Sequence, residues 1–394
     1  MDEGEVPRTA ELVVIGGGVV GAATAFRAAR NGLRPVIVEA RGALCTLTTR
    51  KATGAFRLQF DNREELDLIR ESVELFLTFP EATGQQEHDL DIRQPGYLWL
   101  TTEQHRVERQ RALVKRQRSW GLADVEVLSG DDVRHRFPYV GPNVLQGRFR
   151  AADGFLDPTQ LTLGLAKASG APVILEARVT GFRTEHGRLI GVETSRGPIA
   201  TERAVVACGP LSGRVAELAG VELPIETVLR HKLAIPNVPE VPPDAPMTID
   251  EDTGTHWRPA AQGAWLLCTD PRTPPGPPTE EPRPDPGFAP SVLDPSSPLA
   301  AARIVPFWRE VWKRGGRNWH VEAGQYTMTP DHRPLIGPTT VEGLYVNTGY
   351  SGHGIMGSPA GSRILADVLT GRIAARDNPF RLDRAFDRRD PDTL

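Results

Sequence analysis

Residues 11–40 (ELVVIGGGVVGAATAFRAARNGLRPVIVEA) constrain the fold more than any other part of the sequence. The apolar residues 12–15 predict a short buried strand that leads into a glycine-rich turn, GGGVVG, at residues 16–21. Small and apolar residues as far as Gly32 then predict a helix, and the run PVIV at 35–38 predicts a second strand. Such a strand-helix-strand unit is the building block of a parallel sheet with helices on its faces.

The glycine spacing in this turn is typical of dinucleotide-binding sites. Gly16 allows a tight turn, Gly18 lets the backbone approach a pyrophosphate, and Gly21 lets the helix and the strand pack closely. The N–H groups of the first helical turn, at Val19 and Val20, would then face the phosphates. A glycine-rich turn that binds no ligand is the alternative, because such turns are common.

Glu39 lies 18 residues after Gly21, at the end of the second strand. Its carboxylate is placed to accept hydrogen bonds from ribose hydroxyls and would repel a 2′-phosphate, so FAD or NAD fits better than NADP. Ala40 and Arg41 follow it and belong to the same expected end of the site.

Composition and charge exclude several classes of protein. The 394 residues carry a formal net charge of -4, so no general basic surface for nucleic acid is expected. The three cysteines lack metal-ligand spacing, and we expect reduced thiols and no metal site. No apolar run approaches the ~20 residues of a membrane span, and the N-terminus has no signal pattern. We therefore expect a cytoplasmic protein that binds neither nucleic acid nor membrane.

Between its ends the chain alternates helical and strand patterns. The hydroxyl-rich loop 41–60 is expected beside the second half of a ligand. The predicted helices are 64–79, 102–120 and 159–168. The predicted strands are 96–100, 173–179, 204–209 and 223–236, and the segment 247–267 predicts further strand interrupted by turns. The basic residues of 102–120 are typical of a solvated helix face. Residues 271–298 contain eleven prolines and predict an exposed, irregular excursion without chemistry.

A second strand, glycine turn and helix follow at residues 343–347, 349–354 and 358–369. Nicotinamide enzymes of the doubly wound type continue in regular strand-helix alternation, whereas this chain passes through antiparallel-looking strands before the second unit. That arrangement favours a long cofactor held at both ends. A flavin gains negative charge at its N1 and C2 carbonyl edge on reduction, and a second helix N-terminus would stabilise that charge. A nicotinamide cofactor stays open on the first motif alone.

Several segments together resemble the D-amino acid oxidase and sarcosine oxidase superfamily of FAD-dependent oxidoreductases. They are GGGVVG with Glu39, TTRKATGAFR (48–57), ADGFLDP (152–158), VVACGPLSG (205–213), AGQYTMTPDHRPLIGP (323–338) and GYSGHGIMGSPAGSRILADVL (349–369). The chain is most similar to sarcosine oxidase beta subunits and related amine dehydrogenases, over nearly all of its length except the proline-rich insert.

The resemblance implies an α/β fold of the glutathione reductase-2 type, with a Rossmann-like FAD-binding domain and a second α+β substrate domain on a mixed sheet. Residues 1–85, 150–222 and 320–394 would form the discontinuous FAD-binding domain, and residues 86–149 and 223–319 the substrate domain. The implied reaction oxidises the C–N bond of an amine or N-alkyl amino acid by hydride transfer to flavin N5, and the imine product hydrolyses. A flavin-bearing subunit that needs partner proteins for activity is the alternative.

The resemblance also assigns residues to the site. Those expected around the cofactor are Arg50, Ala52 and Thr53 at the pyrophosphate and flavin, Val179 at the adenine, and Ala207, Gly209, Gly352, His353, Gly354, Ile355 and Met356 around the flavin. Arg57 matches an arginine that pairs with a substrate carboxylate, Tyr326 an aromatic residue over the flavin, and His256 an aromatic pocket position. Alternatively, Arg57 could pair with Asp61 or Glu64, Tyr326 could be an ordinary core residue, and His353 could serve the turn through its backbone.

Departures from the family pattern carry their own predictions. Gly324 replaces a cysteine that binds the flavin covalently, and residues 41–60 contain no histidine that could do so, so FAD should be held non-covalently. Met356 replaces a lysine that is a second carboxylate partner, and an oxygen-activating lysine falls at Leu266 or Leu267. These losses weaken the expectations of a small amino acid substrate and of oxygen as the acceptor.

Overall fold

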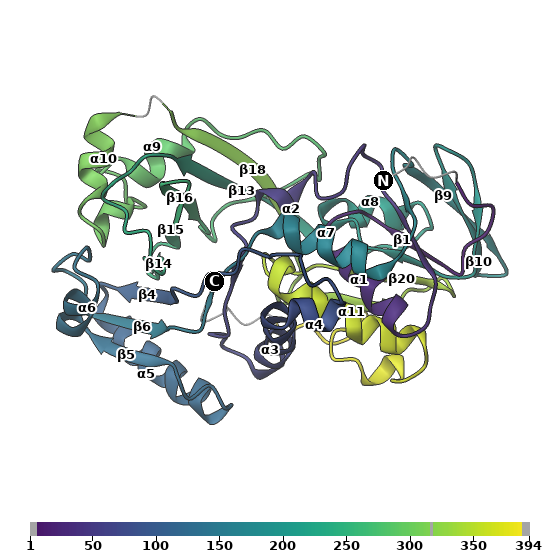
Figure 1. Ribbon diagram of the computed structural model, residues 1–394, viewed down its shortest axis with the longest axis horizontal. Coiled ribbons are helices and arrows are strands. Elements are labelled where there is room, and N and C mark those ends of the chain that lie inside the picture. The colour runs from purple at the N-terminus through teal and green to yellow at the C-terminus, as the bar shows by residue number, and fades with distance from the viewer. Residues whose placement is uncertain (1–5, 316–317, 388–394) are drawn as a thin grey trace.

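The computed structural model describes residues 6–315 and 318–387, so part of the polar N-terminal segment, residues 1–5, lies outside the described residues. Figure 1 shows two halves along the longest axis. One half contains a mostly parallel sheet with helices α1, α7 and α11 beside it, and the other contains a large mixed sheet with α9 and α10. The two-part α/β fold expected from the sequence is therefore confirmed.

The first half is built on a six-stranded sheet whose neighbours come from distant parts of the chain. Its order is β19 (Leu335–Pro338), β20 (Leu344–Thr348), β12 (Ala204–Val206), β1 (Leu12–Ile15), β2 (Pro35–Val38) and β8 (Val173–Ile174). All neighbouring strands are parallel except β19 and β20. Every residue of β1 and β2 is buried, which explains their continuous apolar runs. The turns after β1, β12 and β20 consequently meet at one edge of the sheet.

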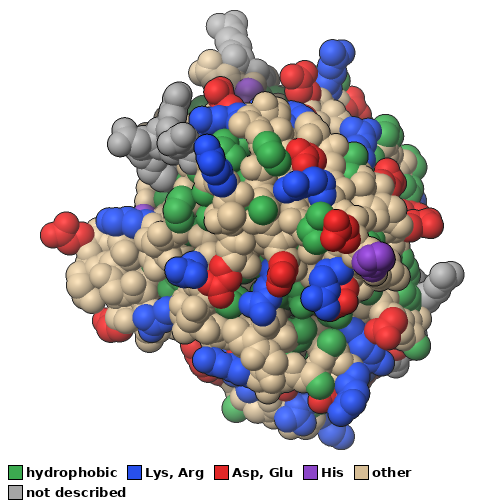
Figure 2. All heavy atoms as spheres, turned by 90° about the vertical axis from the view of Figure 1, so that its right-hand side faces the viewer, with side chains coloured by type: hydrophobic (Ala, Val, Ile, Leu, Met, Phe, Trp, Pro, Cys, Tyr) green, Lys and Arg blue, Asp and Glu red, His purple; other side chains and the backbone are tan. Residues whose placement is uncertain are grey.

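Helices cover one face of this sheet and smaller elements cover the other. The helices are α1 (Val19–Arg30), α3 (Arg63–Leu77), α7 (Pro158–Ser169) and α11 (Gly354–Leu369). Phe26, Leu161 and Leu365 from three of them share a buried cluster with β1 and β2. The opposite face packs against a three-stranded sheet, β9 (Val179–Glu185), β10 (Arg188–Thr194) and β11 (Ile199–Ala200), and against α8 (Ser212–Glu217). On the outer face of this half, acidic and basic side chains are interspersed (Figure 2).

The second half is built on a nine-stranded sheet. Its order is β17 (Pro275–Gly276), β13 (Glu226–Ile235), β16 (Gly263–Cys268), β15 (Thr255–Ala260), β14 (Met247–Asp250), β4 (Tyr97–Thr101), β6 (Gln146–Arg150) and β5 (Glu126–Ser129), with β18 (His320–Met328) paired to β13. Only β14 and β4 among these described pairs run parallel.

Alternation along these strands separates a core face from a cavity face. Leu98 and Leu100 of β4 point into a cluster with Trp257 and Trp308, beneath α6 (Gly130–Arg136), α9 (Phe288–Leu293) and α10 (Trp308–Arg314). Tyr97 and Trp99 of the same strand point the other way and pack with Met247 and Ile249. This second face lies toward the six-stranded sheet and lines the candidate site.

Short elements complete the fold. They are α2 (Thr48–Lys51), β3 (Ala55–Phe56) paired with β7 (Gly154–Phe155), α4 (Phe79–Thr83), α5 (Gln104–Ser119), and the 3-10 turns Gly209–Leu211, Ala301–Arg303 and Ala375–Asp377.

Three sequence predictions need correction. The predicted strand 173–179 is divided, because β8 ends at Ile174 and β9 begins at Val179 on a different sheet. The last long helix begins at Gly354 rather than 358 and contains Pro359. The proline-rich insert is not wholly irregular, because α9 buries Phe288 and Leu293 in the second core.

The division into domains stays a prediction, and one strand bears on where its boundary lies. Strand β18 falls within the range assigned to the FAD-binding part, yet it pairs with β13 from Glu226 to Ala234 in the nine-stranded sheet. We therefore propose that the chain crosses between the two halves after Met328 rather than at 320. The chain reaches the six-stranded sheet again at β19.

Candidate functional site

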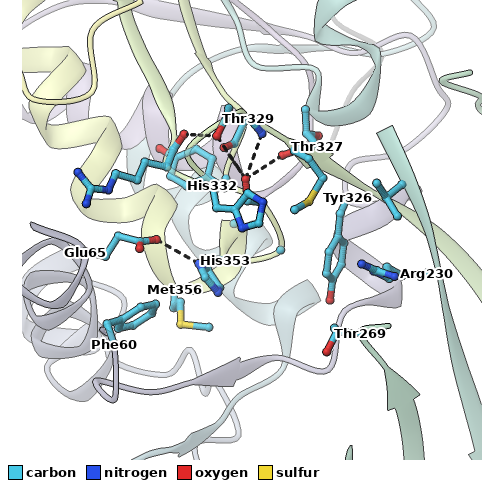
Figure 3. A pocket seen from close by; sticks show the side chains of 18 of the residues that line it. Phe60, Glu65, Arg230, Thr269, Tyr326, Thr327, Thr329, His332, His353 and Met356 are labelled. Atoms are coloured by element: carbon cyan, nitrogen blue, oxygen red, sulfur yellow. Dashed lines mark hydrogen bonds and ion pairs between the residues drawn. The ribbon is translucent and has the colours of Figure 1, made fainter. Parts of the chain in front are cut away.

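One cavity of about 1960 Å³ runs between the two halves. It is lined at one end by Val19 and Val20 of α1 and at the other by Trp99, Ile249 and His256 of the nine-stranded sheet. This volume exceeds the ~300–1,000 Å³ typical of sites for drug-sized ligands, so the cavity has room for a long cofactor and a substrate. Figure 3 shows its middle, where Tyr326, His353 and Met356 approach one another from different elements.

The glycine-rich turn has the close contacts that the sequence predicted. Gly16 has φ +113°, and a Cβ there would lie 2.6 Å from the carbonyl oxygen of Ala207. A Cβ on Gly21 would lie 1.8 Å from the carbonyl oxygen of Gly16. Side chains at these positions would therefore push the turn away from β12 and the helix away from the turn.

Helix α1 begins at this turn with an open N-terminus. Its N-cap, Gly18, provides no side-chain cap. The hydroxyl of Thr49 accepts a hydrogen bond from the N–H of Val19 at 3.2 Å, and Val20 lines the cavity. Thr49 was not among the predicted site residues, although the hydroxyl-rich character of loop 41–60 indicated a ligand there. The open helix end suits an anionic group such as a pyrophosphate.

Glu39 lies beside the glycine-rich turn, at what we call the dinucleotide end of the site. Its Oε2 accepts from the N–H of Gly17 at 2.6 Å, and its Oε1 accepts from the N–H of Arg41 at 2.9 Å. Burial raises the pKa of Glu39, and these two hydrogen bonds oppose the rise. The carboxylate is thus fixed at the carboxyl end of β2, where ribose hydroxyls are expected.

A strap formed by residues 271–287 of the proline-rich insert connects the nine-stranded sheet to this end. The side-chain amide of Gln325 accepts from the N–H of Thr279 and donates to the carbonyl of Pro277, both at 2.8 Å. The next residue, Glu280, accepts from Arg178 at 2.9 Å and lies 3.7 Å from Nη1 of Arg41. The strap therefore reaches from β18 to the residues beside Glu39.

Helix α11 begins at the opposite side of the cavity. His353 is its N-cap and provides no side-chain cap, so the N–H groups of the first turn have no acceptor within the helix. Gly352 has φ +94°, and a Cβ there would lie 2.6 Å from the Tyr326 ring. Gly352, Gly354, Ile355 and Met356 all line the cavity. Two helix N-termini therefore open on one space.

The imidazole of His353 connects a carboxylate to an arginine. Its Nδ1 lies 3.2 Å from Oε1 of Glu65, and its Nε2 lies 3.4 Å from Nη2 of Arg57. Because a carboxylate accepts and a guanidinium donates, Nδ1 carries the proton and Nε2 faces the arginine. Burial raises the pKa of Glu65, but the hydrogen bonds from His353 and Asn62, together with the nearby charge of Arg57, help to leave the pKa below its ordinary value. His353 therefore contributes its ring as well as its backbone.

Arg57 is buried in an aromatic stack. Its Cζ lies 4.3 Å from the Phe60 ring centroid and 5.2 Å from that of Trp99. Its Nη1 donates to the carbonyl of Gln59 at 2.8 Å, and it lines the cavity. Burial lowers its pKa. The structure thus places Arg57 in the pocket, and its contact with a substrate carboxylate stays a prediction.

Tyr326 and His256 lie on the cavity face of the nine-stranded sheet. Burial raises the pKa of Tyr326, which keeps the phenol protonated. His256 Nδ1 lies 2.9 Å from the carbonyl oxygen of Gly254. Because a carbonyl oxygen can only accept, Nδ1 carries the proton and donates, and Nε2 of the neutral ring is an acceptor. Burial, with the nearby charges of Arg230 and Arg57, lowers the pKa of His256 to about 4. The imidazole is therefore neutral near pH 7.

The predicted residues fall into two groups. Those that line the cavity are Val19, Val20, Ala52, Thr53, Arg57, Gly209, His256, Tyr326, Gly352, His353, Gly354, Ile355 and Met356. Those that do not are Gly16, Gly18, Gly21, Glu39, Ala40, Arg41, Arg50, Val179 and Ala207. Most of the second group shape the turn and the end of β2, whereas the Arg50 side chain is exposed to solvent.

The sequence interpretation missed Arg230, which lies beside Tyr326 in Figure 3. Its position on a strand gave no local signal. Within residues 6–315 and 318–387, no group of three or more His, Cys, Asp and Glu side chains is arranged to hold a metal ion. In the same residues, no helix combines the length and apolar character needed to cross a bilayer.

Comparisons with known proteins agree with this geometry. The chain is 25% identical over 390 residues to mitochondrial dimethylglycine dehydrogenase of Mus musculus, which covers 91% of the chain and 42% of that protein. It is 26% identical to sarcosine oxidase subunit beta of Arthrobacter sp, covering 96% of the chain and 92% of that subunit. The chain thus spans less than half of the dimethylglycine dehydrogenase that it matches.

The fold is also similar to solved structures. L-proline dehydrogenase from P. horikoshii superimposes with a TM-score of 0.81 at 24% identity, over 96% of each chain. A model of the family described as FAD dependent oxidoreductase matches residues 11–368. That match includes both glycine-bearing helix starts and both sheets. The chain therefore belongs to the FAD-dependent oxidoreductase family of D-amino acid oxidase type.

Proposed function

We propose that this enzyme oxidises the C–N bond of an amine or an (N-alkyl) amino acid. The observation that carries this proposal is the single cavity that joins the N-termini of α1 and α11 to the polar face of the nine-stranded sheet. Bound FAD would supply the two-electron acceptor for a hydride from the α-carbon of the neutral amine, and the iminium product would add water and split into a carbonyl compound and an ammonium ion.

The chain's own residues supply binding and electrostatics for this reaction. The N-terminus of α11 favours negative charge at its end of the cavity. The neutral Nε2 of His256 can accept a hydrogen bond from the substrate N–H, and Tyr326 presents its ring and hydroxyl beside that position. Trp99 and Ile249 provide an apolar wall that excludes water.

An anaerobic screen tests the proposal. Primary amines, secondary amines and N-alkyl amino acids are mixed with the yellow enzyme, and bleaching of the flavin absorbance identifies substrates. The return of colour on admitting air then measures oxygen as an acceptor. Reduction by 2-hydroxy acids or alcohols, with none by amines, would replace amine oxidation by another reaction class.

We also propose that FAD is bound without a covalent link. Gly324 has no side chain, and the nearest side-chain atoms to a Cβ built there belong to Lys51 and Thr48, at 3.8–3.9 Å. Acid precipitation should therefore leave the flavin in the supernatant. Yellow colour that stays in the washed pellet would contradict this.

A second candidate is a flavin-bearing subunit that needs partners for activity. The near-complete match to sarcosine oxidase subunit beta supports it. Gel filtration and co-purification from the native host test it, followed by flavin reduction assays of the chain alone and of any complex. Amine turnover by the isolated chain at the rate of the complex would exclude this candidate.

A further inference from the structure

Arg230 is held rigidly at the cavity wall by one side of its guanidinium. Its Nη1 donates to the carbonyl of Asp270 at 3.0 Å and to the hydroxyl of Thr273 at 2.8 Å. Asp270 directly precedes the strap and Thr273 lies near its start, and Thr273 is in turn fixed by a hydrogen bond to the same carbonyl. These contacts fix the plane of the guanidinium before any ligand binds.

The other edge of the same guanidinium makes no hydrogen bond among the described residues. Its Nε is buried and has no hydrogen-bond partner among the described residues. All hydrogen bonds that hold the group use Nη1, so the Nε and Nη2 edge remains for a ligand. That edge presents two parallel N–H bonds and matches the two oxygens of a carboxylate. A buried charged donor without an acceptor is destabilising, and a bound anion would offset that cost.

The surroundings of Arg230 complete an anion site. Its Cζ lies 5.8 Å from the centroid of the Tyr326 ring, and Figure 3 shows the guanidinium beside the ring and above Thr269. Arg230, Tyr326 and Thr269 all line the cavity. The neutral His256 lies two strands away on the same face, since β13 pairs with β16 and β16 with β15. On this face of the sheet, Arg230 can donate hydrogen bonds to an anion and His256 can accept one from an N–H group.

We propose that Arg230, with the hydroxyl of Tyr326, is the residue that binds the substrate carboxylate, so that the enzyme acts on amines that carry a carboxylate. This inference rests on the proposed amine oxidation. It also assigns Arg57 a positioning role, because that guanidinium lies between two aromatic rings and against His353.

Ligand binding tests the assignment without turnover. The holoenzyme is titrated with acetate, propionate and benzoate and with the corresponding amides, and the change in the visible flavin spectrum gives Kd. The acids should bind and the amides should bind far more weakly. Arg230→Gln should raise Kd for the acids roughly 100-fold. Arg230→Lys should raise Kd less, because lysine keeps the positive charge but lacks the two parallel N–H bonds of the guanidinium.

Arg272→Gln is the matched control. Arg272 lies in the same loop, its side chain is 74% exposed, and it pairs with the carboxylate of Asp270. Flavin content and melting temperature establish that each variant folds. Unchanged acid binding in Arg230→Gln, or acids that bind no better than amides in wild type, would overturn the proposal. A loss of acid binding in Arg57→Lys but not in Arg230→Gln would show that Arg57 binds the carboxylate, and it would also overturn the proposal.

Flavin reduction provides a second measurement. With pairs such as proline and pyrrolidine, or sarcosine and dimethylamine, Arg230→Gln should raise the apparent Kd of the amino acid far more than that of the plain amine. An equal effect on both members would indicate a structural role and count against the assignment. If no amine reduces the flavin, the proposed function fails, while the acid titration still decides the role of Arg230.

Discussion

At the scale of single residues, the site depends on polar groups that are fixed before any ligand arrives. Glu39 is held by two backbone N–H groups, and Arg230 by a carbonyl and a hydroxyl. His256 is held by the carbonyl of Gly254. Each therefore presents a defined acceptor or donor to the cavity or to its dinucleotide end.

Glu39→Gln should weaken FAD binding. The amide keeps the shape but replaces one carboxylate oxygen by a donor, which opposes the N–H of Gly17 or of Arg41. We expect Kd for FAD to rise roughly tenfold to 100-fold, measured by quenching of flavin fluorescence on titration of the apoprotein. Glu11→Gln is the control, since Glu11 pairs with the exposed Arg34. Equal Kd values for FAD in both variants would show that Glu39 does not contribute to cofactor binding.

His256 should make the protein sensitive to acid. Its pKa is about 4 in the folded protein, against 6.5 in the unfolded chain, so the unfolded state binds more protons between these values. Its contribution to stability is present above about pH 6.5 and is lost as the pH falls toward 4, by about 3 kcal/mol in total.

His256→Gln should accordingly lose less stability than wild type between pH 7 and pH 4.5. Urea unfolding at several pH values measures this difference. The exposed His105→Gln is the control, and its pH profile should follow wild type. Parallel profiles for His256→Gln and wild type would contradict the neutral state of the half-buried imidazole.

At the scale of elements, local patterns were predictable and cross-strand placement was not. The strand-turn-helix of residues 12–30 follows from its apolar run and glycine spacing, because these act over neighbouring residues. The sheet to which β18 belongs depends on register with β13, about 90 residues earlier, and nothing in either segment specifies it. Arg230 was missed for the same reason, since only that pairing brings it to Tyr326.

The proline-rich insert shows a different limit. Its eleven prolines indicate an irregular segment, and they obscured the apolar residues Phe288, Val292 and Leu293, which form one buried face of α9. The preceding strap is irregular in backbone, yet Gln325 and two arginines hold it in place. Prolines restrict the unfolded chain, so this ordering costs less entropy than in a flexible loop.

The strap should slow the release of FAD. Glu280→Gln removes the ion pairs with Arg178 and Arg41, which are partly exposed and therefore weak. We expect the dissociation rate of FAD to rise about twofold to fivefold, measured by transfer of flavin to an excess of a competing apoflavoprotein. Glu281→Gln, at the exposed neighbouring position, is the control. A rate unchanged in Glu280→Gln would mean that the strap does not retain the cofactor.

At the scale of the whole molecule, the first and last parts of the described chain are joined by a buried polar network. Asn347 of β20 donates to the hydroxyls of Thr24 in α1 and Ser362 in α11, both at 3.0 Å, and accepts from Tyr350 at 2.6 Å. Each of these groups is buried. The network therefore fixes the two helices whose N-termini open on the cavity.

Asn347→Leu should destabilise the protein by about 2–4 kcal/mol, because the hydroxyls of Thr24, Ser362 and Tyr350 lose their partner. Urea unfolding followed by circular dichroism measures the change, and FAD affinity should fall with it. Asn143→Leu serves as the control, since that exposed amide bonds one carbonyl at 2.9 Å. Full stability of Asn347→Leu would show that packing alone holds the two helices.

The packing of α1 against α11 has a consequence for biosynthesis. Residues 19–30 leave the ribosome early and residues 354–369 leave it last among the long helices, yet both line the same cavity. While the chain is still growing, the dinucleotide turn has no opposing wall, and the flavin has nothing to bind at its ring end. Loading of the cofactor therefore requires that residues 354–369 have been made and have folded against α1, and translation products that end before them should accumulate colourless.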